Sequence, residues 1–206
     1  MRTHLLALSL LPLAMACKDV KEGEGHDHHH HDHNHGLTTA VVLDFTPESG
    51  DTLSFTWEDP TADGANIKID DIELMSGVSY DLGVRVLNQL EEPVEDVTAE
   101  ILEQAEEHQF FFTGSAVSGP ASDSDAAPLQ HTYNDVDADG LPLGIDNLMD
   151  AVSTGDGELT VTLRHLPPES GAATKVEGLA DTVQTGGFAA IGGDTDVEVT
   201  FPVTVN

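Results

Sequence analysis

From Leu37 onward, apolar and polar residues alternate with a period of two along much of the chain. Threonine, valine, leucine and phenylalanine dominate these runs, which is the pattern of strands with one buried face. The expected strands cover residues 38–46, 52–58, 67–75, 79–88, 108–113, 129–134, 158–166 and 196–205. Short strands separated by glycine and proline turns predict an all-β fold, a single antiparallel β-sandwich of the immunoglobulin-like kind.

One segment departs from the strand pattern and predicts a short helix. In residues 95–108, Asp96 can cap a helix opposite whose glutamates lies an apolar face of Val97, Ile101, Leu102 and Ala105. We expect a helix this short and acidic to cover an edge or end of the sandwich. The long stretches without a regular pattern, which we expect to be loops, are residues 114–128 and 167–195.

The start of the chain has the features of a bacterial lipoprotein signal. MRTHLLALSLLPLAMAC combines a basic start, an apolar run too short to span a bilayer and small residues before Cys17. Its end resembles the lipobox, in which the cysteine thiol is lipidated, and an anchor accounts for a cysteine that has no disulfide partner. We expect a signal peptide over residues 1–16. Lys18 stands where aspartate would retain an inner-membrane lipoprotein, which favours the outer membrane; an ordinary cleaved signal is the alternative.

The remaining chain divides into a tether and one domain. Residues 17–36 are polar and lack apolar periodicity, so we expect a lipidated, disordered, His- and Asp-rich tether ahead of a sandwich domain at 37–206. Asp and Glu total 38 against 7 Lys and Arg, a formal net charge of −31. This charge repels phosphate backbones and argues against a nucleic-acid partner. It suits solubility, attraction of divalent cations, or both.

The tether contains GHDHHHHDHNHG, residues 25–36, a composition typical of metal-binding tracts. Neutral imidazole is a common ligand for zinc, copper and nickel, and aspartates add oxygen donors. The candidate ligands are His26, His28, His29, His30, His31, His33, His35, Asp27 and Asp32. The tract predicts capture of a divalent transition metal, with zinc favoured. Solvated filler and a purification tag are the alternatives.

Three further histidines, His108, His131 and His165, lie on expected strands. Alternation places each of them on the apolar face of its strand. Two interpretations stay open, because sequence does not show which strands are neighbours. Each is a buried neutral histidine with a backbone hydrogen bond, or two of them converge, helped by an acid such as Glu107, into a second metal or ligand site.

The acidic turn DVDADGLPLGID, residues 135–146, resembles the calcium loop of EF-hands and dockerins. The carboxylates that match its ligand spacing, with glycine at the turn, are Asp135, Asp137, Asp139 and Asp146. Pro142 and Leu143 depart from the pattern, because a flanking helix and a water-bridging ligand are expected there. Weak calcium binding and an ion-free aspartate turn both remain open.

The domain also carries a resemblance to a known family. Its motifs are EEHQFFFTG (106–114), GLPLG (140–144), LTVTLRH (159–165) and GGDTDVEVTFPVTV (192–205). They resemble a family of small bacterial envelope lipoproteins in which a His- and Asp-rich stretch after the lipobox precedes a β-rich domain. Members are sometimes named after the type 1 periplasmic binding fold, which alternates strands and helices over two lobes, unlike this pattern. The resemblance implies an envelope lipoprotein serving an outer-membrane transporter of metal or metal complexes, and it implies no catalytic residue.

Two functions therefore compete. The first is a metal-capturing outer-membrane lipoprotein; the second is a β-sandwich adhesion or ligand-binding module with an incidental histidine tract. A sugar-binding module would need a row of exposed aromatics, and Trp57, Tyr80 and Tyr133 are the only Trp and Tyr residues. We do not expect an enzyme, since no spacing selects a nucleophile with its base and no GxSxG, P-loop or HExxH motif occurs.

The lipid anchor is testable on its own. Acyl chains contribute about 0.8 kcal/mol per buried methylene, so two or more chains hold a protein on a membrane almost permanently. We expect Cys17→Ser to move the protein from the membrane fraction to the soluble fraction, as measured by fractionation and immunoblotting. Unchanged partition into the membrane fraction would contradict the lipoprotein prediction.

Overall fold

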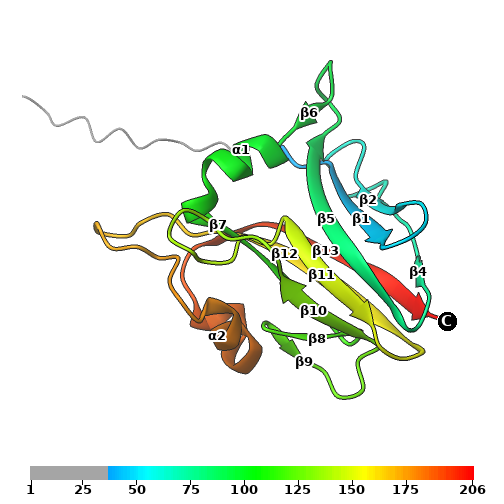
Figure 1. Ribbon diagram of the computed structural model, residues 1–206. Helices are drawn as coiled ribbons and strands as arrows, with labels where there is room; N and C mark the ends of the chain where they lie inside the picture. Colours follow the sequence, from blue (N-terminus) through cyan, green and yellow to red (C-terminus); the bar gives the residue numbers. More distant parts are fainter. Residues whose placement is uncertain (1–36) are drawn as a thin grey trace, which may run out of the picture. The chain divides into compact units, whose positions relative to one another are not determined.

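The computed structural model describes residues 37–206, in which two β-sheets pack face to face (Figure 1). The all-β sandwich predicted from the alternating pattern is confirmed. The predicted signal peptide, Cys17 and the histidine tract lie outside the described residues. Within residues 37–206, no helix is long and apolar enough to cross a membrane.

The larger sheet has nine strands, in the order β3-β2-β1-β5-β11-β10-β8-β9, with β6 paired to β5. Their bounds are β1 (Ala40–Pro47), β2 (Leu53–Glu58), β3 (Lys68–Ile69), β5 (Val78–Asn88), β6 (Glu95–Asp96), β8 (Val117–Gly119), β9 (Ser122–Asp123), β10 (Leu129–Tyr133) and β11 (Asp146–Ala151). We call it sheet A. All of its pairs are antiparallel except β8 with β10.

The smaller sheet, sheet B, has four strands in the order β4-β13-β12-β7. Their bounds are β4 (Ile72–Leu74), β7 (His108–Thr113), β12 (Gly155–His165) and β13 (Asp194–Val205). β12 pairs antiparallel with β7 and β13, while β4 runs parallel to β13. The long expected strand 67–75 is thus divided, with β3 in sheet A and β4 in sheet B.

Inward-facing positions of both sheets form one hydrophobic core. Leu43 and Val84 of sheet A and Phe112, Val161 and Phe201 of sheet B are buried in the same cluster. Fully burying such a side chain contributes about 1.5–3 kcal/mol. The alternation read from the sequence therefore sets which face of each strand turns inward.

Two helices accompany the sheets. The predicted one is α1 (Thr98–Glu103), and the 3₁₀ helix η1 (Ala105–Glu107) joins it directly to β7 (Figure 1). The second, α2 (Leu179–Gly186), lies in a stretch expected to be a loop and is followed by the 3₁₀ helix η2 (Phe188–Ala190). Only Leu179 and Val183 of α2 are buried, and they pack in a small cluster with Phe111. Two buried apolar residues between flanking glycines are too few to predict a helix from the sequence pattern.

The sequence pattern also missed β11, which lies between β5 and β10 at the centre of sheet A. Its buried positions are Asn147, Met149 and Ala151. A polar residue stands where alternation calls for an apolar one, which concealed the strand. The shorter strands β8 and β9 likewise lie inside the expected loop 114–128.

A buried ion pair joins the connection between β12 and α2 to the acidic turn 135–146. Lys175 Nζ lies 2.7 Å from Asp137 Oδ2, and the two side chains are 1% and 0% exposed. Lys175 also donates to the backbone oxygen of Ala105, at 2.8 Å. Burial raises the pKa of Asp137, but Lys175 and the backbone N–H groups of Leu141 and Asp139 outweigh it, so the pKa lies below its usual value.

We expect Lys175→Met to lower the free energy of unfolding by about 3–5 kcal/mol, because it leaves the buried carboxylate of Asp137 without its counter-ion. Adding Asp137→Asn should restore part of that loss. Lys68→Met is the control, since its pair with Glu58 has a lysine that is 70% exposed, and such pairs contribute about 1 kcal/mol or less. Urea unfolding followed by circular dichroism measures all three, and equal losses for Lys175→Met and Lys68→Met would contradict this role.

Candidate metal centre

Two of the three domain histidines, His108 and His165, lie side by side where β7 begins and β12 ends. His108 is the first residue of β7 and His165 the last of β12, and the antiparallel register pairs them directly. Their rings are stacked, with centroids 4.9 Å apart and planes 9° from parallel. The side chain of His108 is fully buried, and that of His165 is 13% exposed. The predicted alternation and the register together bring two imidazoles into contact.

A β-bulge places a carboxylate beside them. Leu163 of β12 lies opposite Val197 of β13, yet the next residue, Arg164, lies opposite Thr195. Asp196 is therefore the extra residue of β13 between these two pairs. Because a bulge bends its strand and re-aims the extra side chain, Asp196 does not follow simple alternation. Sequence reasoning missed this residue for that reason.

His108, His165 and Asp196 form the one group of three such ligand residues found within residues 37–206. One ligand atom from each lies within 4.8 Å of the others. The ligands of a tetrahedral zinc ion, with bonds of about 2.0–2.2 Å, lie roughly 3.3–3.5 Å apart. Closing the group around one ion would bring these atoms about 1 Å closer and rotate the stacked rings, because each nitrogen lone pair lies in the plane of its ring. The three residues could hold a metal ion.

The hydrogen bond of His108 identifies its tautomer. Its Nδ1 lies 2.9 Å from the backbone oxygen of Gln104, which can only accept, so we infer that Nδ1 carries the proton. In the neutral ring Nε2 then holds the lone pair, and it lies 3.7 Å from Asp196 Oδ2. A metal-bound histidine commonly donates its other N–H to such a carbonyl.

A second carboxylate, Glu107, lies close to His165. Its Oε2 is 3.6 Å from His165 Nε2, and its side chain is 30% exposed. Its backbone oxygen accepts the N–H of Leu166 at 2.6 Å, which fixes its main chain beside the end of β12. The acid proposed from sequence to assist a histidine pair is therefore close to that pair.

His131 does not join this group and packs instead within the core. It lies on β10 of sheet A, with Nε2 2.9 Å from Asn147 Oδ1. Its ring contacts Phe112 and Tyr133, with centroids 4.3 and 4.6 Å away. Burial lowers the pKa of His131 to about 4, although Asn147 and the charge of Asp135 oppose this shift. His131 is therefore a buried core histidine, but its printed hydrogen bond is to the side chain of Asn147 rather than to the backbone expected from the sequence.

The acidic turn does not form a calcium-type ligand set. Asp135 accepts backbone N–H groups from Gly144, Ile145 and Asp146, at 2.7–2.9 Å. Asp137 is engaged by Lys175, and Asp139 and Asp146 do not complete a close group with them in the described part of the chain. A backbone bridge from Val136 to Pro142 and the burial of Leu143 shape the turn. These contacts favour the ion-free aspartate turn, and weak calcium binding stays a prediction.

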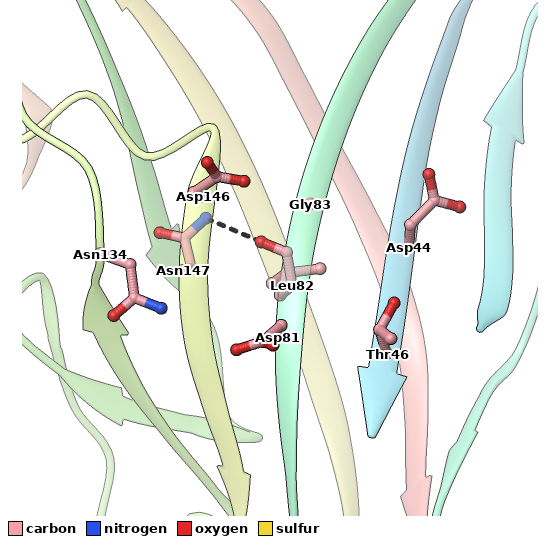
Figure 2. Close-up of a pocket in the computed structure, with 8 residues that line it drawn as sticks. All are labelled: Asp44, Thr46, Asp81, Leu82, Gly83, Asn134, Asp146 and Asn147. Carbon is pink, nitrogen blue, oxygen red and sulfur yellow. Dashed lines mark hydrogen bonds between the residues drawn. The ribbon is translucent and has the colours of Figure 1, made fainter. Parts of the chain in front are cut away.

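A separate acidic depression of about 440 Å³ crosses the outer face of sheet A (Figure 2). Asp44 of β1, Gly83 of β5 and Asp146 of β11 are direct neighbours in the register, so the missing side chain of Gly83 leaves the space between them. Asp44 is already paired with Arg85, at 2.8 Å. None of these carboxylates belongs to a close group of metal ligands within residues 37–206.

No family model, curated protein or solved structure matches the chain. The fold and the site define a β-sandwich protein with a candidate His-His-Asp metal centre at one end of sheet B. Any more particular function must be argued from that geometry.

The pKa of His131 predicts a pH dependence of stability. Its folded value of about 4 lies below the ordinary 6.5, so the unfolded chain takes up a proton before the folded chain does. The stability linked to His131 is fully present above about pH 6.5 and is lost as pH falls toward 4, by up to roughly 3 kcal/mol.

His131→Gln removes this titration while keeping an N–H that can reach Asn147. We expect the difference in unfolding free energy between wild type and His131→Gln to shrink as pH falls, which urea unfolding across this pH range would measure. Because other groups titrate equally in both proteins, identical pH slopes would contradict the role assigned to His131.

Proposed function

We propose that this protein binds a divalent transition-metal ion, with zinc favoured, at His108, His165 and Asp196. The observation that supports it is that these residues, carried by β7, β12 and β13, each bring a ligand atom within 4.8 Å of the others. Two imidazoles and a carboxylate are ligand types that suit zinc and related divalent ions. The hydrogen bond of His108 Nδ1 to the backbone oxygen of Gln104 also supports it, because a metal-bound histidine commonly donates its other N–H to such a carbonyl.

The proposed role in the cell is metal capture at the envelope. In this proposal Cys17 anchors the protein to the outer membrane, the tract between His26 and His35 collects the ion, and the sandwich holds it in a second site. An outer-membrane transporter is the proposed recipient. We expect the sandwich site to bind more tightly than the tract, because strands β7, β12 and β13 already hold its three ligand residues close together.

The competing adhesion or sugar-binding function receives less support. Tyr80 is buried, and its hydroxyl oxygen accepts the N–H of Met75. Tyr133 donates its hydroxyl to the backbone oxygen of Phe110, and Trp57 packs against the core. None of the three stands in an exposed aromatic row of the kind a sugar platform uses.

Zinc titration of the full chain tests the proposal. One variant carries asparagine at the seven tract histidines, His26→Asn through His35→Asn, and isolates the domain site. We expect it to retain one zinc equivalent, measured by competition with a coloured chelator. Adding His165→Ala or Asp196→Asn to that variant should weaken the remaining binding at least about tenfold, which is roughly 1.4 kcal/mol.

His131→Gln in the same background is the matched control, because it removes a domain histidine that lies outside the group. Melting curves without metal would show that each variant is folded; Asp196, at 20% side-chain exposure, is the substitution least expected to disturb the core. If His165→Ala and Asp196→Asn both bind zinc as the parent does, the domain does not bind the ion at this site.

A further inference from the structure

We propose that Glu107 is the fourth ligand of this metal site, so that the ion is held in a closed shell of two histidines, one aspartate and one glutamate. The inference rests on the proposed function. It goes further by assigning a coordination shell with no open position, which distinguishes a holding site from a catalytic one.

The first argument is the symmetry of the two histidine–carboxylate contacts. Asp196 Oδ2 lies 3.7 Å from Nε2 of His108, and Glu107 Oε2 lies 3.6 Å from Nε2 of His165. Each imidazole of the stacked pair thus has its own carboxylate at a similar distance. Glu107 lies outside the close group of His108, His165 and Asp196, so its side chain would turn toward the ion to complete the shell.

The second argument is the way Glu107 is anchored. It precedes His108 in the chain, and its backbone oxygen is bonded to the N–H of Leu166, which directly follows His165. Its main chain is therefore fixed to both strands that carry the histidines. Its side chain is 30% exposed and retains room to turn. Glu107 can move toward an ion while the strand-borne ligands stay in place.

The third argument is charge. With two neutral imidazoles and Asp196 alone, a divalent ion would leave one net positive charge beside the fully buried His108. Burying an uncompensated charge is unfavourable, whereas a second carboxylate makes the ion and its ligands neutral as a whole. Glu107 is the nearby acid positioned to supply that charge.

A closed shell of two nitrogens and two oxygens also predicts selectivity. Zinc and cobalt(II) accept this ligand set in tetrahedral geometry, whereas copper(I) prefers thiolate and thioether ligands. With all four positions filled by protein, no bound water remains to be activated. The site would hold an ion for transfer or for stability of this end of the fold.

Cobalt(II) and zinc, added to the full chain carrying the tract His→Asn substitutions, provide the test. We expect Glu107→Gln to weaken zinc binding at least about tenfold and to change the visible absorption of bound cobalt, which reports coordination number. Glu106→Gln is the matched control, because it makes the same charge change at an exposed neighbour. It should leave affinity within about twofold of the parent, since exposed charges are screened.

Glu107→Asp separates ligation from simple charge attraction. A shorter carboxylate keeps the charge but cannot reach as far, so a true ligand predicts weakened binding. If Glu107→Asp and Glu107→Gln both bind like the parent, with unchanged cobalt absorption, while Asp196→Asn and His165→Ala lose binding, the metal site stands and the fourth-ligand assignment is wrong. If all four variants bind like the parent, the proposed function fails as well. Melting curves without metal should coincide for the parent and both Glu107 variants.

Discussion

Backbone hydrogen bonds that pair β12 with both β7 and β13 determine the position of every residue of the candidate metal centre. The pairing with β7 sets His165 opposite His108, and the irregular pairing with β13 sets Asp196 out of alternation beside them. A one-residue shift in either ladder would turn a ligand to the opposite face of sheet B. The site therefore depends on register, and register in turn depends on the apolar inner face that both sheets bury.

Buried polar groups in this fold have different kinds of partner. Lys175 and Asp137 neutralise each other, and His131 stays neutral against Asn147. In each case the buried group has a polar partner inside the protein, as expected for buried polar groups. His108 differs, because its hydrogen bond to the backbone leaves Nε2 facing the carboxylate of Asp196. A carboxylate rather than an amide beside the ring separates the candidate ligand His108 from the core histidine His131.

The short connection from α1 to β7 links the metal centre to the stability of the fold. Within it, the backbone oxygen of Gln104 orients His108, and that of Ala105 accepts Lys175. Glu107 contributes its side chain to His165 and its backbone to Leu166. Binding of an ion at the histidines would thus be expected to rigidify the segment that also holds the buried ion pair.

Alternation in the sequence was sufficient to predict the sandwich, because a strand with one buried face must repeat apolar residues every second position. It also placed His108 and His165 on inward faces. It did not reveal β11, where the inward Asn147 interrupts the pattern, or α2, which buries only two residues. In both cases contacts with other segments, rather than a periodic apolar pattern in the sequence, stabilise the element.

The spacing of the acidic turn suggested calcium, yet Lys175 reaches Asp137 from a segment distant in the chain, and backbone N–H groups occupy Asp135. Likewise, the sequence identified the histidines as candidates but not which of them meet. The sequence by itself determined the two-sheet class, the faces of the strands and the ligand types. Only the tertiary structure decided which ligands converge, since strand neighbours, the bulge at Asp196 and the buried partner of Asp137 arise from contacts between segments far apart in the chain.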